Sequence, residues 1–353
     1  MTMPKDIPII DTMISFPTRD KKAQYKFITD QTKDAESKGD FEFPVEYMFK
    51  DVPDEHTSDE DPVEVTIREM DKYNITKGLI GVRGEDSQRA IKKYPERFVA
   101  AINVDPNKGM DAVREIQQAQ RDFDIRAVDI FPAGLFPQVA INDKKMYPIY
   151  AKCVELGISV WVNAGVPGPR LKMDCQKVEY IDEVMYDFPE LVFVTRHGCE
   201  PWEDLAVKLM LKWPGLHYCT SAFAPKHYPK AILKYANSRG ADKIIYAGYF
   251  PMGLTLERIM GDMDTYVDLK AEVRRQLALG YTKDQVIASF ERSYGEFIRL
   301  EPKAEGFNWL VWLMPALALV VGALVIFFRL RPQAPAAAAH PAALPPHEES
   351  KPS

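Results

Sequence analysis

The chain contains 353 residues, of which 46% are hydrophobic, and carries a formal net charge of −6 at pH 7. This composition suffices for one large core or two ordinary domains, and the lack of a basic excess excludes nucleic acid as an expected partner. The four cysteines show no Cys-x-x-Cys spacing, so the sequence predicts buried reduced thiols rather than a zinc knuckle or a redox pair.

Short apolar runs recur along the first two thirds of the chain, and each is followed by a turn-rich loop and an amphipathic segment. A strand buried on both faces is expected to be such a near-continuous apolar run. The predicted strands are Ile7–Asp11, Lys77–Val82, Phe98–Val104, Arg126–Phe131, Ile158–Asn163, Leu191–Thr195, Leu216–Thr220 and Lys243–Ala247.

Segments with helical periodicity lie between these strands. They are Pro62–Tyr73, Ser87–Tyr94, Met110–Arg121, Asp143–Leu156, Lys177–Phe188, Glu200–Leu211, Pro225–Ser238 and Leu254–Met263. Alternating strands and helices indicate βαβ units and a parallel sheet. The pattern predicts an α/β fold, a (β/α)₈ TIM-type barrel over residues 1–265. A doubly wound open sheet is the alternative, but no G-x-G-x-x-G motif follows the first strand.

The loops after the strands are expected to form the mouth of this barrel. The first connection, Thr12 to Asp61, is long and rich in charges and aromatic residues, as lids and binding segments often are. Arg170 lies in the loop after the fifth predicted strand, and Arg196 directly follows the sixth. Each is a candidate for bidentate binding of a substrate carboxylate. The alternative for each is a packing or surface role.

His197 follows the sixth apolar run directly and precedes Gly198, Cys199, Glu200, Pro201 and Trp202. Catalytic groups in barrels of this type stand at the carboxyl ends of strands, so His197 is the leading candidate for chemistry. A structural hydrogen bond at the strand end is the alternative. Pro201 is expected in the first turn of the helix Glu200–Lys212.

The pattern changes after Met263. A helical hairpin is predicted over residues 266–300, and its second helix is expected to begin with the capping box Thr282-Lys-Asp-Gln285. Residues 307–328 contain no charge and include Trp309 and Trp312, which predicts one transmembrane helix. Residues 332–353 are rich in proline and alanine and are expected to be a disordered tail.

Residues 7 to about 262 resemble the amidohydrolase family 2 barrels, which include aminocarboxymuconate semialdehyde decarboxylase. The matching motifs are Ile9-Ile-Asp11-Thr12, Tyr94-Pro-Glu-Arg-Phe98, Val194-Thr-Arg-His197-Gly198 and Ile244-Ile-Tyr-Ala-Gly-Tyr-Phe-Pro251. The resemblance implies a divalent metal, usually zinc, held by an H-x-H on strand one, histidines on strands five and six and an aspartate on strand eight. Such a metal activates water.

This sequence departs from the family at most of those positions. The H-x-H corresponds to Met13 and Ser15, the strand-five histidine to Asn163 and the strand-eight aspartate to Tyr249, while His197 is retained. One imidazole with a thioether, an amide and a hydroxyl is a poor zinc site, because zinc prefers several N, S or carboxylate ligands. We therefore expect a degenerate metal site, and no cofactor is predicted.

Three interpretations of the pocket remain open. In the first, His197 acts as general acid or base with help from Glu200, Asp129 or Tyr249, and a substrate is bound by residues of the mouth. In the second, a metal is kept by Asp11, Asp129 or Glu200. In the third, the barrel is a pseudoenzyme that binds a small molecule or a partner. The candidate substrate-binding residues are Arg170, Arg196, Asn163 and Trp202.

Residues 268–331 resemble the C-terminal part of CcmH/CycL-type cytochrome c maturation proteins. The matching segments are Glu272-Val-Arg-Arg-Gln-Leu277, Tyr294-Gly295-Glu-Phe297, Pro302 and Gly306-Phe-Asn-Trp-Leu-Val-Trp-Leu-Met-Pro315. In that family a Cys-x-x-Cys pair reduces apocytochrome thiols. No cysteine follows Cys219 here, so this thiol chemistry cannot be assigned.

The sequence therefore predicts a membrane-tethered amidohydrolase-related enzyme that hydrolyses or decarboxylates a small carboxylated compound. The expected partners are a small-molecule substrate, the membrane through residues 307–328, and further copies of the chain in a homo-oligomer. The N-terminus lacks a secretory signal, so the barrel is expected in the cytoplasm. The rival is a non-catalytic membrane protein related to cytochrome c maturation, with the barrel as a binding module.

Overall fold

The computed structural model describes residues 8–49, 52–263, 282, 285 and 288. The chain divides into two units, Met1–Glu272 and Val273–Ser353, and the elements named here belong to the first. The predicted hairpin, membrane span and tail lie almost wholly outside the described residues. Among the described residues, no helix is long and apolar enough to cross a membrane.

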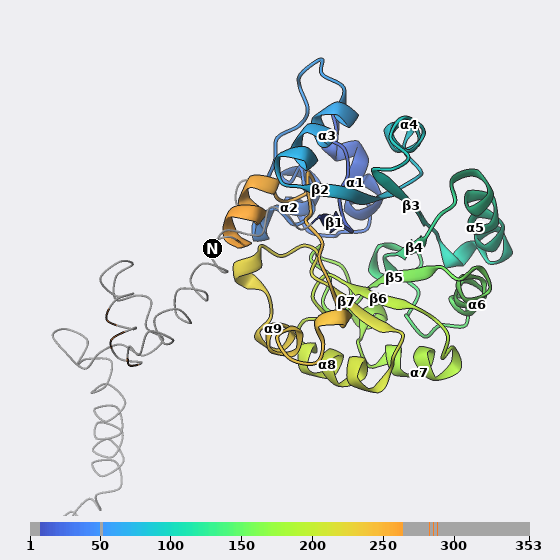
Figure 1. Cartoon of the computed structure of the whole chain (residues 1–353). Coiled ribbons are helices and arrows are strands. Elements are labelled where there is room, and N and C mark those ends of the chain that lie inside the picture. Colours follow the sequence, from blue (N-terminus) through green and yellow to red (C-terminus); the bar gives the residue numbers. More distant parts are fainter. Residues whose placement is uncertain (1–7, 50–51, 264–281, 283–284, 286–287, 289–353) are drawn as a thin grey trace, which may run out of the picture. The chain divides into compact units, whose positions relative to one another are not determined.

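Eight parallel strands form one curled, TIM-like sheet in the order of the sequence, β1 to β8 (Figure 1). The predicted strand number, direction and order are confirmed. The strands are β1 (Ile9–Asp11), β2 (Ile75–Gly81), β3 (Phe98–Asn103), β4 (Ala127–Ile130), β5 (Ser159–Asn163), β6 (Phe193–Arg196), β7 (Leu216–Cys219) and β8 (Ile244–Ile245).

Helices α3 (Pro62–Lys72), α4 (Glu85–Lys93), α5 (Met110–Phe123), α6 (Tyr147–Leu156), α7 (Tyr180–Asp187), α8 (Glu203–Lys212) and α9 (Lys230–Ala236) lie around the outside of this sheet (Figure 1). Two further helices, α1 (Lys21–Thr29) and α2 (Ala35–Gly39), belong to the connection that follows β1. Residues 256–263 are also helical. Short 3₁₀ turns are η1 (Glu46–Met48), η2 (Pro106–Lys108), η3 (Pro132–Gly134), η4 (Asp174–Gln176), η5 (Pro225–His227) and η6 (Ala241–Lys243).

Local sequence signals explain where several helices begin and end. Asp61 caps α3 by accepting a hydrogen bond from the N–H of Val63, and Pro62 occupies the first turn. Gly157 ends α6 in the left-handed conformation that glycine adopts without strain. In the second unit, the predicted capping box is present, since Thr282 and Gln285 exchange side-chain to backbone hydrogen bonds of 2.8 and 3.3 Å.

Several helix predictions were wrong in their bounds: α6 begins at Tyr147 and not at Asp143, and α7 begins at Tyr180 and not at Lys177. Two others have an identifiable reason. Helix α8 begins at Glu203 and not at Glu200, so Pro201 lies in the preceding turn rather than in the first helical turn. The segment predicted as one helix from Pro225 is divided into η5 and α9, because Pro229 cannot continue a helix that started before it.

The buried apolar residues form three clusters, one of which packs around Val63, Met70 and Ile259 near β1 and α3. The larger cluster packs the outer face of the sheet against the helices and includes Ile116, Tyr150 and Phe193. A smaller cluster lies on the inner face and consists of small residues around Trp161, such as Ala101 and Ala127. The four cysteines are buried and free, which confirms the predicted state of the thiols.

Hydrogen bonds join the segments that follow β1 and β8. The N–H of Tyr249 donates to the carbonyl oxygen of Met13 at 3.1 Å, and the N–H of Ser15 donates to Phe250 at 2.9 Å. The Asp11 Oδ1 atom accepts from the N–H groups of Met13 and Gly248 at 2.9 and 2.8 Å. A buried carboxylate thus connects the first and last strands of the sheet.

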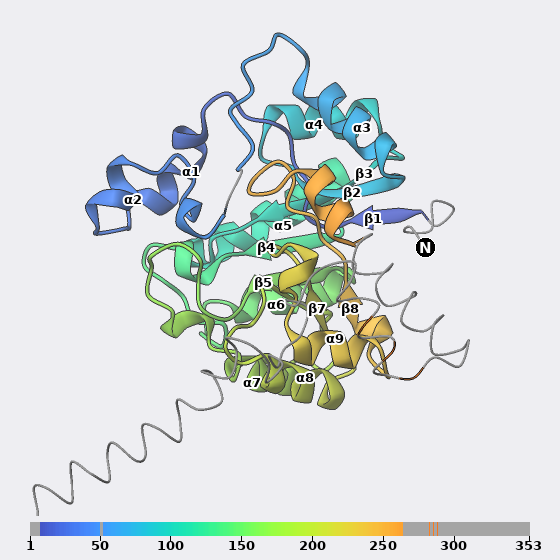
Figure 2. The same ribbon diagram turned by 90° about the vertical axis from the view of Figure 1, so that its left-hand side faces the viewer.

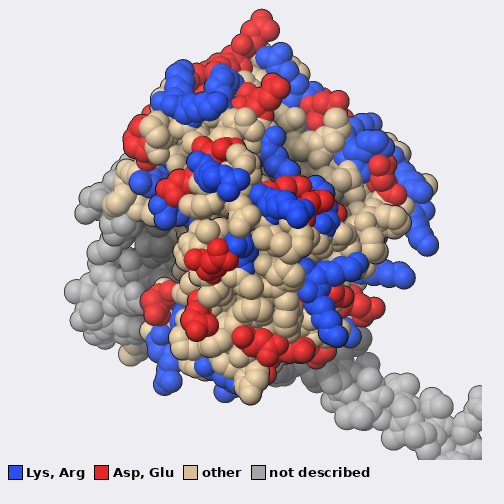
Figure 3. Space-filling model, turned by 90° about the vertical axis from the view of Figure 1, so that its right-hand side faces the viewer, with Lys and Arg blue, Asp and Glu red and all other residues tan. Residues whose placement is uncertain are grey.

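The long connection between β1 and α3 carries α1, α2 and η1, which stand at one end of the strands (Figure 2). We call residues 16–49 the lid. Elsewhere the surface shows no single sign of charge on the face drawn in Figure 3, where lysines and arginines alternate with aspartates and glutamates.

Candidate active site

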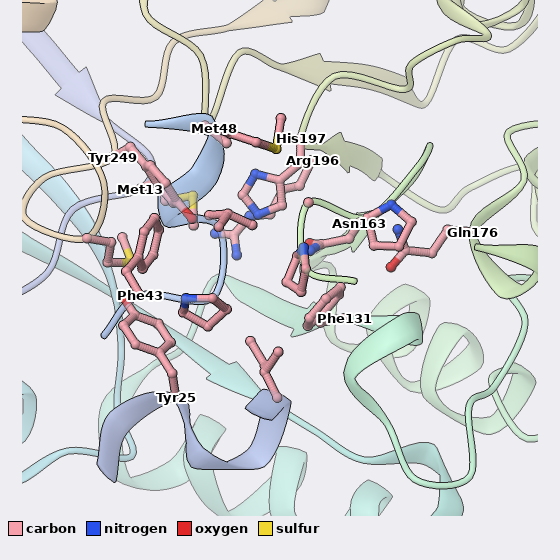
Figure 4. A pocket seen from close by; sticks show the side chains of 18 of the residues that line it. Met13, Tyr25, Phe43, Met48, Phe131, Asn163, Gln176, Arg196, His197 and Tyr249 are labelled. Carbon is pink, nitrogen blue, oxygen red and sulfur yellow. The ribbon is translucent and has the colours of Figure 1, made fainter. Parts of the chain in front are cut away.

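A cavity of about 360 Å³ lies between the carboxyl ends of the strands and the lid (Figure 4). Its walls are mainly aromatic and aliphatic, and most of its polar residues come from the ends of β3 to β6 and from the loops that follow, with Gln24 coming from α1. This is where barrels of this type place their reactive groups. The aromatic residues lining it are Tyr25, Phe27, Phe43, Phe49, Phe131, Phe223 and Tyr249.

The floor of the cavity contains an ion pair between Arg196, the last residue of β6, and Asp129 on β4. The Nη1–Oδ1 distance is 3.2 Å, and both side chains are buried. The guanidinium also donates to the carbonyl oxygen of Thr12 at 3.4 Å and lies 5.2 Å from the ring centre of Trp161. Burial raises the pKa of Asp129 although Arg196 opposes the shift.

This ion pair is not fully satisfied within the chain. The Nε atom of Arg196 and the Oδ1 atom of Asp129 are buried without a hydrogen bond of good geometry. Buried polar atoms of this kind are normally paired, and unpaired ones need an explanation such as a ligand or an ordered water. The floor is therefore able to take a further polar partner.

His197 follows β6 directly and lies beside Arg196 in the cavity wall (Figure 4). It begins a turn in which His197, Gly198 and Cys199 have φ angles of 64°, 94° and 57°. Ser221 holds the imidazole, with its Oγ 3.2 Å from Nδ1. Burial, and secondly the Arg196 charge, lower the pKa of His197 to about 3, so its imidazole is neutral near pH 7.

Tyr249 closes the side of the cavity next to β1. Its ring centre lies 5.8 Å from those of His197 and Phe49 and 6.2 Å from that of Phe43. Burial raises the pKa of Tyr249 well above its ordinary value, so the phenol stays protonated and can only donate or accept a hydrogen bond.

Glu200 and Asn163 also belong to the polar lining. Burial, with a contribution from Glu203, raises the pKa of Glu200. The backbone carbonyl of Glu200 accepts from the N–H of Val166 at 2.7 Å, which fixes its turn against the loop after β5. Asn163 ends β5 and lines the cavity, and its amide has no protein partner among the described residues.

Most of the predicted site residues are thus brought together, but three are not. Arg170 does not line the cavity: it pairs with Asp34 and Glu36 of the lid at 2.5 and 2.7 Å. Trp202 precedes α8 and packs against the outer core. Ser15 is held in backbone hydrogen bonds and does not line the cavity. The predicted lining residues in the cavity are Asp129, Asn163, Arg196, His197, Glu200, Tyr249 and Met13.

Other residues of the site were not predicted. Ser221 comes two residues after β7, and a polar residue after an apolar run was the available signal for it. Gln176 joins two loops, since its side chain donates to Gly165 at 3.0 Å and accepts from Ala133 at 3.1 Å. Tyr25 and Phe43 come from the lid and face the floor across the cavity (Figure 4).

The residues expected at the family's metal positions do not form a ligand cluster. Met13, Asn163, His197 and Tyr249 line the cavity, together with the cation of Arg196. Within residues 8–49 and 52–263, no group of three His, Cys, Asp or Glu side chains is placed to hold a metal ion.

The chain matches two protein families, each over its own range of residues. Residues 36–279 match the amidohydrolase family, which covers more than half of the sequence. The chain belongs to the amidohydrolase family. Residues 261–352 match a second family, described as cytochrome C biogenesis protein. Both resemblances inferred from the motifs are thereby confirmed.

Solved structures of other proteins show a similar fold. An uncharacterized TIM-barrel protein from Bordetella bronchiseptica is 21% identical, with a TM-score of 0.54 over 74% of this chain and 91% of that one. The 5-carboxyvanillate decarboxylase of Novosphingobium aromaticivorans, solved with manganese and 4-hydroxy-3-methoxy-5-nitrobenzoic acid, is 17% identical, with a TM-score of 0.50 over 74% and 92%. At these identities the likeness concerns the fold alone.

The C-terminal part of this amidohydrolase-family chain is similar to curated cytochrome c-type biogenesis proteins CcmH. It is 35% identical over 85 residues to the protein of Bradyrhizobium diazoefficiens, and the aligned stretch covers 24% of this chain and 53% of that protein. It is 32% identical over 59 residues to the protein of Pseudomonas aeruginosa, and this stretch covers 17% of this chain and 38% of that protein. The chain thus spans about half or less of these relatives.

Proposed function

We propose that the barrel of this amidohydrolase-family protein binds a small aromatic carboxylate and decarboxylates it without a metal ion. The observation that carries the proposal is the buried cation of Arg196 at the foot of an aromatic-walled cavity. Among the described lining residues, Arg196 is the only lysine or arginine. A planar guanidinium binds a carboxylate through two parallel hydrogen bonds, and the surrounding rings suit a flat apolar body.

The donor set supports metal-independent chemistry. A thioether, an amide, a phenol and one imidazole do not form the N, S or carboxylate set that zinc prefers, and the neighbouring guanidinium repels a second cation. We therefore regard Met13, Ser15, Asn163 and Tyr249 as replacements in a degenerate metal site and assign no step to a metal.

Decarboxylation fits this site better than hydrolysis. Hydrolysis requires an activated water, and the neutral imidazole of His197, with its pKa of about 3, is a weak base. Decarboxylation needs a proton for the ring carbon instead. As the bond between ring and carboxylate breaks, carbon dioxide leaves and the electron pair stays on the ring carbon. Glu200 lines the same cavity and supplies the proton to that carbon, and it regains a proton from solvent before the next turnover. Burial raises the pKa of Glu200, which favours the protonated donor form.

The structural neighbours support the same substrate class. The Novosphingobium aromaticivorans protein named above is a 5-carboxyvanillate decarboxylase and was solved with a nitrobenzoic acid. Since only the fold is shared at that identity, we carry over the class of ligand, an aromatic carboxylate, and not the compound or the manganese.

Calorimetric binding of 4-hydroxy-3-methoxy-5-nitrobenzoic acid tests the proposal. In protein dialysed against a chelator, the acid should bind about 10- to 100-fold more tightly than 2-methoxy-6-nitrophenol, which lacks the carboxylate, as expected for a charge-assisted hydrogen bond. Release of carbon dioxide from a panel of hydroxybenzoates then tests turnover. Stoichiometric bound metal that is required for binding would contradict the proposal.

Substitution of the cation separates its role from folding. Arg196→Met alone would leave Asp129 buried and unpaired, so it is combined with Asp129→Asn. The double variant should fold and lose the preference for the acid over the phenol. Arg170→Met, which removes an arginine outside the cavity, should keep that preference.

A second proposal concerns the C-terminal region. The match of residues 261–352 to the cytochrome c biogenesis family favours membrane attachment, and we propose that residues 307–328 tether the barrel on the cytoplasmic side. Topology reporters placed before Met1 and after Ser353 should report the cytoplasm and the opposite side, respectively. If the N-terminal reporter lies in the periplasm and no benzoate is turned over, the alternative function is favoured, that of a non-catalytic protein related to cytochrome c maturation.

A further inference from the structure

Ser221 contacts His197 at two atoms. It follows β7, which lies beside β6 in the sheet, so the two residues meet at neighbouring strand ends. The N–H of His197 donates to the Oγ atom of Ser221 at 3.2 Å, and the same Oγ lies 3.2 Å from Nδ1 of the imidazole. Ser221 is completely buried.

The hydroxyl group decides which ring nitrogen carries the proton. A serine hydroxyl has one proton to donate and two lone pairs to accept with. Because Oγ already accepts from the N–H of His197, a proton on Nδ1 would direct two donors at one oxygen. The hydroxyl proton would then lack a strong acceptor, since the one other side chain recorded in hydrogen-bond contact with Ser221 among the described residues is the thiol of Cys219, a weak acceptor.

The opposite arrangement satisfies every strong donor. The hydroxyl donates to Nδ1, and the proton of the neutral imidazole is on Nε2. This Nε2 atom has no hydrogen-bond partner among the described residues, although His197 lines the cavity beside Arg196 and Asn163 (Figure 4). A free N–H group, a guanidinium and an amide thus share one wall of the cavity.

We propose that Ser221 locks His197 in the Nε2–H tautomer, so that His197 donates a hydrogen bond to an anionic oxygen of the ligand instead of accepting a proton from it. Ser221 is then a positioning residue, and His197 with Arg196 forms an anion-binding pair. The assignment of that oxygen to a carboxylate rests on the proposed function, whereas the assignment of the tautomer does not depend on it.

Nitrogen NMR of histidine-labelled protein without ligand tests the tautomer directly. His197 should show a protonated, pyrrole-type Nε2 and an unprotonated, pyridine-type Nδ1, with the signals assigned by their loss in His197→Gln. Ser221→Ala removes the lock and should mix the two tautomers, a change that a merely structural role of Ser221 would not cause. A protonated Nδ1 in the native protein would overturn the inference, whatever the cavity binds.

Binding of 4-hydroxy-3-methoxy-5-nitrobenzoic acid tests the donor role. His197→Met has similar length but no N–H group and should bind the acid at least about 10-fold more weakly. His197→Gln supplies an amide N–H at a similar reach and should restore most of that loss. Equal affinities of the Met variant and the native protein for the acid would overturn the donor role of His197. If the protein shows the predicted tautomer but binds neither this acid nor 2-methoxy-6-nitrophenol, the proposed function is refuted and the tautomer assignment stands.

Discussion

The floor and the lid line one cavity but are built in different ways. The floor consists of strand ends, and its charged groups, Asp11, Asp129 and Arg196, are at least nine-tenths buried. The lid is a long connection between β1 and α3. It contacts the rest of the unit through apolar side chains, such as Phe43 and Phe49 against Tyr249, and through polar contacts at its surface. The polar contacts include the exposed pairs that Arg170 makes with Asp34 and Glu36.

The difference shows where stability and access are controlled. A buried charge changes the free energy of unfolding by several kcal/mol when its partner is lost, whereas an exposed ion pair contributes roughly 0–1 kcal/mol. Changes in the floor should therefore alter the stability of the whole unit. Changes in the contacts of the lid should alter how often the cavity opens.

Asp11→Asn gives the largest effect that we expect. Burial raises the pKa of Asp11 from 3.8 to about 6. The folded state holds this proton more tightly than the unfolded state does, so stability falls as pH rises from about 4 to about 6 and is then level. At pH 7 the variant should be more stable by up to about 3 kcal/mol, because asparagine keeps the acceptor for Met13 and Gly248 without the charge.

Denaturant unfolding at pH 4 and pH 7 measures this difference. At pH 4 the carboxyl is protonated in the folded native protein, so the two proteins should differ little. Asp124→Asn, at an exposed position, should change the unfolding free energy by less than about 0.5 kcal/mol at both pH values. If Asp11→Asn is less stable than the native protein at pH 7, the charged carboxylate stabilises the hydrogen bonds that connect the segments after the first and last strands.

Arg170→Ala should have a smaller effect on stability and a visible effect on the lid. Its guanidinium lies 5.0 Å from the ring centre of Tyr47 and 5.5 Å from that of Phe41, besides its two ion pairs. The free energy of unfolding should change by less than about 1 kcal/mol. Hydrogen exchange of residues 16–49 should become several-fold faster, while β4 to β6 remain protected.

Arg114→Ala provides the matched control, because Arg114 makes one exposed pair with Asp111 on α5, away from the lid. It should leave exchange in residues 16–49 unchanged. If Arg170→Ala also leaves it unchanged, the other contacts hold the lid without Arg170. These are the hydrogen bond of 2.5 Å between Tyr47 and Gly168, that between Gln31 and Gly134, and the ring contacts of Phe43 and Phe49 with Tyr249.

The floor could be predicted from the sequence because strand ends have a regular pattern. An apolar run that stops at a polar residue places that residue at the carboxyl edge of a parallel sheet, and this identified His197. Asn163 was identified through the family resemblance. The pattern does not say which neighbour a side chain contacts. For this reason Ser221, the partner of His197, was missed although it follows a predicted strand.

The lid could be predicted as an element but not in its contacts. Irregular segments have no periodicity, so the position of Arg170 could be guessed only from its residue type, and it contacts the lid instead of the cavity. Trp202 was misplaced because the turn after His197 is one helical turn longer than the pattern suggested, which directs the indole to the outer core.

The four buried thiols give the folded unit a measurable property of its own. Burial raises the pKa values of Cys153 and Cys199 to about 12 and that of Cys175 to about 11, and it also raises that of Cys219. Since the thiolate is the nucleophile, a folded barrel reacts slowly with alkylating reagents. The rate of alkylation then measures the opening of the surrounding structure, with no label introduced.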